Sequence, residues 1–180
     1  MDAPREQDER IHGAERWLAV LRIGVGAWFL KGVLTKVSFT LAGGFVPFLE
    51  ANVRWTRVMP IIVNSFASEH PVEWYADFLV DTVVANGALF ADLTALGETA
   101  VGVGLLLGLA TRPAALIGLT MMVGYGFANY WTGLGTQGFH ALLVISMLAF
   151  FFGGAGRVWG VDGWIRRRNP ESWWASWPIS

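Results

Sequence analysis

Charged residues are unevenly distributed along this chain of 180 residues, and their distribution constrains the fold more than any other feature. The first 16 residues carry eight charged side chains, whereas the window from Gly97 to Leu109 carries one, Glu98. A helix of about 20 mainly apolar residues is long enough to cross the hydrocarbon of a bilayer. With 54% hydrophobic and 15% charged residues, the chain is predicted to be an integral membrane protein of one domain rather than a water-soluble globule.

Four apolar segments are predicted to span the membrane, so the expected fold class is an all-α bundle of four transmembrane helices. They cover residues 17–37, 87–110, 114–131 and 139–154. Residues 38–86 contain no comparable run, and we expect one or two short helices there, lying on the outer surface or folded over the bundle. The transmembrane domain then comprises residues 17–156, between a polar N-terminus at 1–16 and an arginine- and tryptophan-rich tail at 157–180.

The positions of the basic residues predict the orientation of the bundle. With four spans, the two termini and the turn at residues 111–113 lie on one side, which carries eight arginines. Beyond Lys36, the other side carries Arg54 and Arg57 among five acidic residues. The positive-inside rule therefore places both termini in the cytoplasm. The tail combines tryptophans with three consecutive arginines, which indicates an interfacial anchor or a docking surface for other membrane subunits.

Several classes of protein are excluded by composition. The chain has no cysteine, so it has no disulfide, thiolate metal site or redox dithiol of its own. Its three histidines are too few and too scattered to hold a haem between two helices, and no metal or flavin site is evident. A net charge of −1 gives no basic surface for nucleic acid.

Five ionisable residues fall within the predicted spans, where such residues are functional candidates. They are Arg22, Lys31, Lys36, Asp92 and Glu98. At about 1.5 Å of rise per residue, Lys31 and Glu98 lie roughly 18–21 Å from the cytoplasmic ends of their helices, and Lys36 and Asp92 roughly 27–28 Å. We therefore expect one or both of these ion pairs between the first two helices. The pairs either neutralise charge for insertion or handle protons or a ligand. Arg22 is expected to snorkel to the headgroups, or to reach a buried carboxylate.

A second polar set gathers at the outer ends of the helices, and it comprises Asn129, Tyr130, Trp131, Gln137 and His140. Together with Lys36 and Asp92, these residues are candidates for a pocket beneath the outer insert, suited to a quinone headgroup or a small anion. In the alternative interpretation, Tyr130 and Trp131 are interface anchors and His140 is a solvated residue at a helix start.

Three motifs then point to a family. The segment from Arg22 to Lys36 combines an arginine, small residues and a lysine near its far end, and Gly97-Glu98 begins a run that ends in Thr111-Arg112. A glycine-rich stretch from Gly154 to Asp162 follows the last predicted span. In order and spacing, over most of residues 17–165, these motifs resemble the DoxX/DoxD-like membrane proteins, and the long insert resembles the DoxD-like branch.

The resemblance implies a small prokaryotic protein of the cytoplasmic membrane, related to the membrane subunit of thiosulfate:quinone oxidoreductase. It implies a quinone as cofactor, a second subunit as partner, and Arg22, Lys36, Glu98 and Arg112 as motif residues. Two functions follow as alternatives. The chain is either the membrane subunit of such a quinone-linked electron-transfer system or a non-catalytic accessory subunit of a larger respiratory or photosynthetic complex. A transporter is less favoured because no internal repeat is visible.

Overall fold

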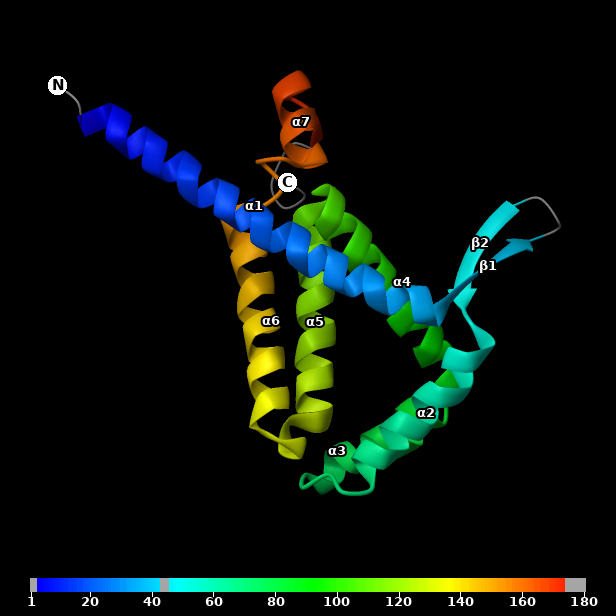
Figure 1. The fold of residues 1–180 in the computed structure, drawn as a ribbon. Helices are drawn as coiled ribbons and strands as arrows, with labels where there is room; N and C mark the ends of the chain where they lie inside the picture. Colours follow the sequence, from blue (N-terminus) through cyan, green and yellow to red (C-terminus); the bar gives the residue numbers. More distant parts are fainter. Residues whose placement is uncertain (1–2, 43–45, 174–180) are drawn as a thin grey trace.

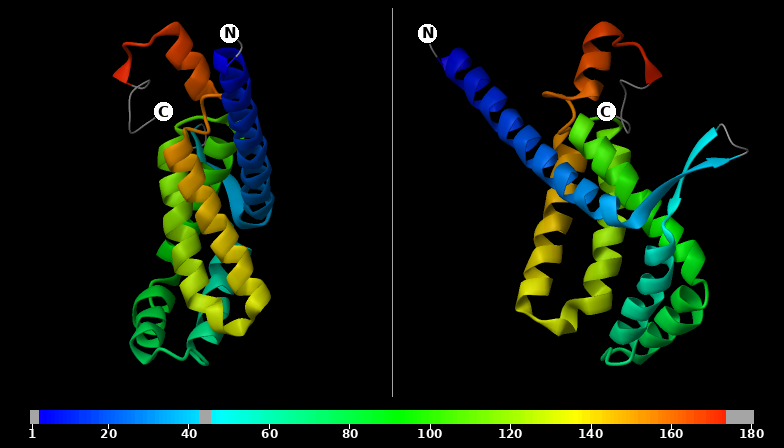
Figure 2. Two further views of the ribbon diagram at one scale, coloured as in Figure 1. Left: turned by 90° about the vertical axis from the view of Figure 1, so that its left-hand side faces the viewer. Right: turned by 45° about the vertical axis from the view of Figure 1, so that its right-hand side comes forward.

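The computed structural model describes residues 3–42 and 46–173, which form a helical bundle with a hairpin at one side (Figure 1). The four long helices are α1 (Ala3–Lys36), α4 (Gly87–Leu107), α5 (Thr111–Asn129) and α6 (Leu134–Gly153). Helix α1 packs against α4, α5 packs against its antiparallel neighbour α6, and α1 runs obliquely to the α5–α6 pair (Figures 1 and 2). Short elements lie at both ends of this bundle.

Three helical segments are long and apolar enough to cross a membrane, namely Gly13–Lys36 of α1, all of α4 and all of α6. Their bounds lie within a few residues of the first, second and fourth predicted spans, and they identify a multi-pass membrane protein. Helix α5 corresponds to the third predicted span. It is less apolar because it begins with Thr-Arg-Pro and carries Tyr125 and Asn129 in its second half.

A β-hairpin directly follows α1, where the sequence predicts short helices. Strand β1 (Val37–Ala42) pairs antiparallel with β2 (Val46–Ala51), and Val37 lies opposite Ala51. The N–H of Asn52 donates to the carbonyl of Lys36 at 2.7 Å, which closes the base of the hairpin. Short apolar runs of this length do not distinguish strand from helix by periodicity, so the hairpin was missed.

The remainder of the insert is mainly helical. Helix α2 (Val53–Ala67) is capped by Asn52, whose side-chain oxygen accepts from the N–H of Trp55 at 2.7 Å. Helix α3 (Glu73–Phe78) continues into a π-helical turn, η1 (Leu79–Val84), and the chain then bends at Asn86 into α4. A small core joins these elements to α4 and consists of Met59, Ala67, Leu79, Val83 and Ala91. The insert is therefore packed onto the bundle.

The main core lies where α1, α4, α5 and α6 meet, and its largest members are Phe29, Leu105, Met122, Leu143, Met147 and Phe150. Glycines allow α1 and α4 to approach closely. A Cβ at Gly26 would lie 2.5 Å from the backbone nitrogen of Leu106, and a Cβ at Gly102 would lie 2.8 Å from the side chain of Leu30. Small residues at such contacts permit close helix packing in membranes.

Asp162, near the start of α7 (Val161–Arg168), caps the N-terminus of α5. Its carboxylate oxygens accept hydrogen bonds from the N–H groups of Ala110 at 2.8 Å and Thr111 at 2.9 Å. Ala110 has a left-handed backbone with φ of 45°, and its side chain has no acceptor to offer. A carboxylate at this position satisfies free N–H groups and interacts favourably with the helix dipole. Helix α7 thereby holds the turn between α4 and α5.

Arg22 is fully buried beside this junction, so the expectation that it snorkels to the headgroups is wrong. Its Nη1 donates to the carbonyl of Leu105 at 2.7 Å and its Nη2 to the carbonyl of Trp159 at 3.0 Å. The carboxylate of Asp162 is near enough to attract the guanidinium electrostatically. Arg22 therefore ties α1 to the end of α4 and to the segment before α7.

We expect Asp162→Asn to lower the free energy of unfolding by about 1–3 kcal/mol, because an amide has one acceptor oxygen in place of two and carries no charge. Thermal unfolding of the detergent-purified protein measures this change. Glu171→Gln, which alters an exposed carboxylate just beyond α7, is the matched control and should change stability by less than about 0.5 kcal/mol. Equal midpoints for the two variants would contradict the capping role.

Candidate functional site

A partly buried ion pair joins the end of α1 to α4. The Nζ of Lys36, the last residue of α1, donates to both carboxylate oxygens of Glu98 at 2.5 and 2.7 Å. The Glu98 side chain is 7% exposed and that of Lys36 is 19% exposed. Removal of two charges from water is strongly unfavourable unless they neutralise each other. The pair is therefore the main electrostatic link between the first two spans.

The two expected ion pairs, Lys31–Glu98 and Lys36–Asp92, are both wrong. Lys31 is exposed, and its Nζ lies 5.2 Å from the ring centroid of Trp28. Asp92 accepts a hydrogen bond from the N–H of Ala51 at 2.9 Å and so attaches the end of β2 to α4. The expected pairs joined residues at equal depth, which assumes that the two helix axes are aligned. It also ignores the length of a lysine side chain, and that of Lys36 reaches back along α1 toward Gly32.

Two further side chains, Tyr125 and Trp55, contact the ion pair. The hydroxyl of Tyr125, on α5, lies 3.5 Å from Oε1 of Glu98, which is a long hydrogen bond. The Nζ of Lys36 lies 4.5 Å from the ring centroid of Trp55 on α2, and the indole Nε1 of Trp55 donates to Thr94 at 3.1 Å. Lys36 thus has a carboxylate and an aromatic face as partners, and Glu98 has a hydroxyl in reach besides its lysine.

Gly32 leaves the space that Glu98 occupies. A Cβ at this position of α1 would lie 2.9 Å from Oε2 of Glu98 and 3.9 Å from Nζ of Lys36. Any larger side chain would push the carboxylate away from its partner. The glycine on α1 is therefore part of the arrangement that admits a charged group between the helices.

Two cavities adjoin the ion pair. The larger, of about 340 Å³, lies beneath α2, α3 and η1, and Lys36, Tyr125 and His140 are among its polar lining residues. Its apolar walls include Trp55, Met59, Phe78, Leu79 and Phe90. The smaller, of about 220 Å³, is lined by Glu98, Trp28 and Phe139, and again by Lys36, Tyr125 and His140. Lys36, Tyr125 and His140 therefore line both cavities, and Glu98 lines the smaller one. We call the larger one the inner chamber.

The predicted outer pocket divides in the structure. Asn129 and His140 line the inner chamber with Lys36. Tyr130 and Gln137 instead line a shallow hollow between α5 and α6, where the amide of Gln137 donates to the carbonyl of Tyr130 at 2.8 Å. The Nε1 of Trp131 is buried and has no hydrogen-bond partner among the described residues, and Asp92 lines a separate hollow beside the hairpin. A binding role for these residues stays a prediction.

Sequence reasoning missed the roles of Tyr125, Thr94 and Trp55 around the ion pair. Tyr125 lies between Gly124 and Gly126. A lone tyrosine between two glycines in an apolar span was the available signal. Within the residues that the structure describes, no group of three or more metal-ligating side chains is found.

Comparison with known proteins gave one finding. A protein-family model described as "TQO small subunit DoxD" matches residues 17–179, which is nearly the whole chain. The match includes α1 from residue 17 onward, the other three long helices, the insert and the ion pair. The search of curated proteins and the search of solved structures produced no match.

We expect Lys36→Met to lower the free energy of unfolding by about 3–5 kcal/mol, because it leaves the Glu98 carboxylate buried without its cation. Lys31→Met is the matched control on the same helix and should be close to neutral, since Lys31 is exposed. Unfolding of the purified protein in mixed micelles measures both. The double variant Lys36→Met/Glu98→Met should recover most of the loss. A double variant as unstable as Lys36→Met would show that charge neutralisation is not the cause.

Proposed function

Since the chain belongs to the DoxD family, we propose that it is the membrane subunit of a thiosulfate:quinone oxidoreductase-type system and that it provides the quinone-binding environment. The observation that carries this proposal is the position of Lys36 and Tyr125 at the wall of the inner chamber, with Glu98 in contact with both of them and lining the adjoining smaller cavity. These groups combine a cation, a carboxylate and a hydroxyl beside an apolar space. Such a combination suits a ligand that is apolar but exchanges protons.

The chemistry of a quinone fits these groups. A quinone ring has two carbonyl oxygens that accept hydrogen bonds, and its reduction to a quinol takes up two electrons and two protons. The Lys36 ammonium and the Tyr125 hydroxyl are donors, and Glu98 is a carboxylate able to pass a proton on. Trp55, Phe78 and Phe90 give the aromatic walls on which a planar ring stacks. A volume of about 340 Å³ is in the range of small-molecule sites.

The membrane topology that accompanies this proposal has four spans. Helix α5 is the fourth, because it has 19 residues and packs along α6 as its antiparallel neighbour. Both termini then lie on one side with Arg112, Arg157 and the three arginines of α7, which indicates the cytoplasm of a prokaryote. The inner chamber lies toward the opposite side, beneath the insert. Electrons from thiosulfate would reach the quinone through a second subunit.

A non-catalytic role is the second candidate. The two short hydrogen bonds of the Lys36–Glu98 pair satisfy the carboxylate, which is the arrangement that a purely structural ion pair needs. In this case the chain is an accessory subunit of a larger respiratory or photosynthetic assembly. Its exposed apolar helix faces would then contact neighbouring subunits as well as lipid.

The variant Glu98→Gln, assayed at a temperature at which it remains folded, separates these candidates. If Glu98 exchanges protons with a quinone, the folded variant still assembles with its partner chains and loses quinone-dependent turnover. Co-purification of partner chains, identified by mass spectrometry, reports assembly, and reduction of a short-chain quinone by thiosulfate reports turnover. Impaired assembly would favour the accessory role, and normal assembly with normal turnover would contradict both.

We further expect Tyr125→Phe to lower kcat/KM for the short-chain quinone about tenfold, because one hydrogen bond to the ring is lost. Tyr130→Phe is the matched control, since Tyr130 lies outside the inner chamber. The native preparation should also contain extractable quinone. A preparation without quinone, or equal kcat/KM values in the two variants, would overturn the assignment of the inner chamber.

A further inference from the structure

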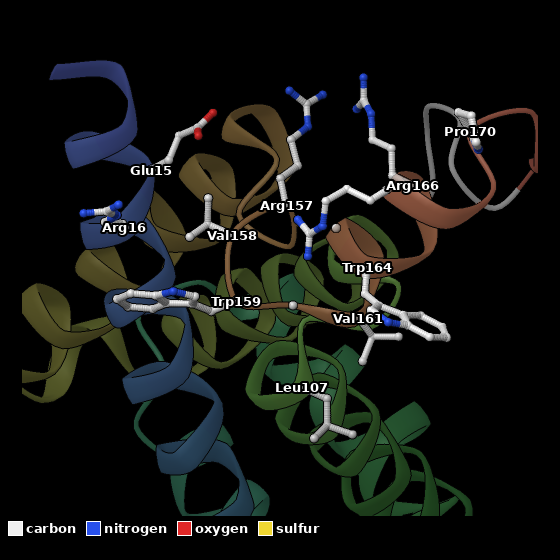
Figure 3. Close-up of a pocket in the computed structure, with 13 residues that line it drawn as sticks. Glu15, Arg16, Leu107, Arg157, Val158, Trp159, Val161, Trp164, Arg166 and Pro170 are labelled. Carbon is white, nitrogen blue, oxygen red and sulfur yellow. The ribbon is translucent and has the colours of Figure 1, made fainter. Parts of the chain in front are cut away.

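A basic cleft lies at the opposite end of the molecule from the insert, and it is larger than the inner chamber. Its volume is about 900 Å³. Its walls come from α1, from the last turn of α4, from the loop at residues 157–160 and from α7 (Figure 3). We propose that this cleft binds the phosphate headgroup of an anionic phospholipid.

The charge of the cleft favours an anion. Four arginines line it, namely Arg16, Arg157, Arg166 and Arg167, against one carboxylate, Glu15. Arg157, Arg166 and Arg167 are exposed, and none of the three forms an ion pair with a side chain that the structure describes. Arg157 and Arg166 are close enough to the neighbouring Arg112 for their charges to repel it. An anion bound among them relieves this repulsion, and guanidinium groups match the geometry of a phosphate.

The cleft also lies at the boundary of the apolar zone. The candidate membrane segments start or end at this level, with Gly13 in α1, Leu107 in α4 and Gly153 in α6. Large apolar side chains remain exposed beside the arginines, and Leu107, Trp159 and Trp164 are 48%, 61% and 51% exposed. Tryptophan favours the headgroup layer of a bilayer. A ligand with an anionic head and an apolar tail covers both kinds of surface, whereas a free anion would leave the apolar part in water.

The cleft is held in shape by buried groups. Trp159 has φ of 50°, in the left-handed region that is unfavourable for a residue other than glycine. Its carbonyl accepts the hydrogen bond from the buried Arg22, and this bond fixes the backbone of the loop. The Trp159 ring is thereby presented at the rim of the cleft (Figure 3). The surface is therefore formed before any lipid arrives.

The test measures lipid binding to the full-length protein purified in a neutral detergent. The probe is phosphatidylglycerol, added in increasing amounts and counted by native mass spectrometry, with phosphatidylcholine as the uncharged comparison. The triple variant Arg157→Gln/Arg166→Gln/Arg167→Gln should bind phosphatidylglycerol at least tenfold more weakly, since each basic residue near an anionic surface contributes about fivefold in affinity. The matched control, Arg54→Gln/Arg57→Gln, removes two exposed arginines of α2 and should bind as the unmodified protein does.

Two further measurements keep the result interpretable. The thermal midpoint without added lipid should be equal in all variants, and lysine at the three positions should restore most of the binding because the charge returns. Equal binding by the glutamine variant and the unmodified protein would overturn the proposal, as would equal binding of the two lipids. Inorganic phosphate that displaces phosphatidylglycerol at millimolar concentration would identify a free-anion site instead. Loss of a co-purifying acidic protein, with lipid binding unchanged, would identify a protein-docking surface.

Discussion

The structure depends on the requirement that charges inside a membrane find partners inside the protein. Water is absent there, so an unpaired charge or backbone group is strongly unfavourable. Lys36 and Glu98 meet this requirement through two short hydrogen bonds, and Arg22 meets it through two backbone carbonyls. The hydrogen bonds of Lys36 and those of Arg22 both link α1 to α4. The first span is therefore attached to the second at both ends of their contact, and the remaining helices pack against this pair.

The segment after the last long helix completes the bundle. Asp162 supplies the cap that the sequence around Ala110 lacks, and the carbonyl of Trp159 receives Arg22. These residues come from the glycine-rich stretch that resembles the family motif, and the structure gives that motif a physical role. It closes the turn between α4 and α5 and, at the same place, shapes the basic cleft. One buried network thus fixes the bundle and presents an arginine-rich surface at the membrane boundary.

The two hollow regions of the molecule differ in chemistry. The inner chamber is mainly apolar, lies under the insert and has Lys36 in its wall, whereas Glu98, the partner of Lys36, lines the adjoining smaller cavity. The basic cleft is exposed, and its arginines outnumber its carboxylates. A membrane subunit that exchanges a quinone with the bilayer needs an apolar chamber with proton-exchanging groups. It also benefits from a fixed position relative to the lipid headgroups. The proposed quinone site and the proposed lipid site meet these two needs at opposite ends of one bundle.

The sequence by itself determined the membrane class, the approximate bounds of the long helices and the family, because hydropathy and motif spacing are properties of local segments. It also identified Lys36 and Glu98 as charges that need partners. The tertiary structure decided which partners they have, because the pairing depends on how α1 crosses α4 and on how far a lysine side chain reaches. It likewise decided that residues 37–42 pair with residues 46–51 as antiparallel strands, and that Tyr125 faces the ion pair. The buried position of Arg22 depends on carbonyls 83 and 137 residues away in sequence, and no local pattern encodes contacts at that separation.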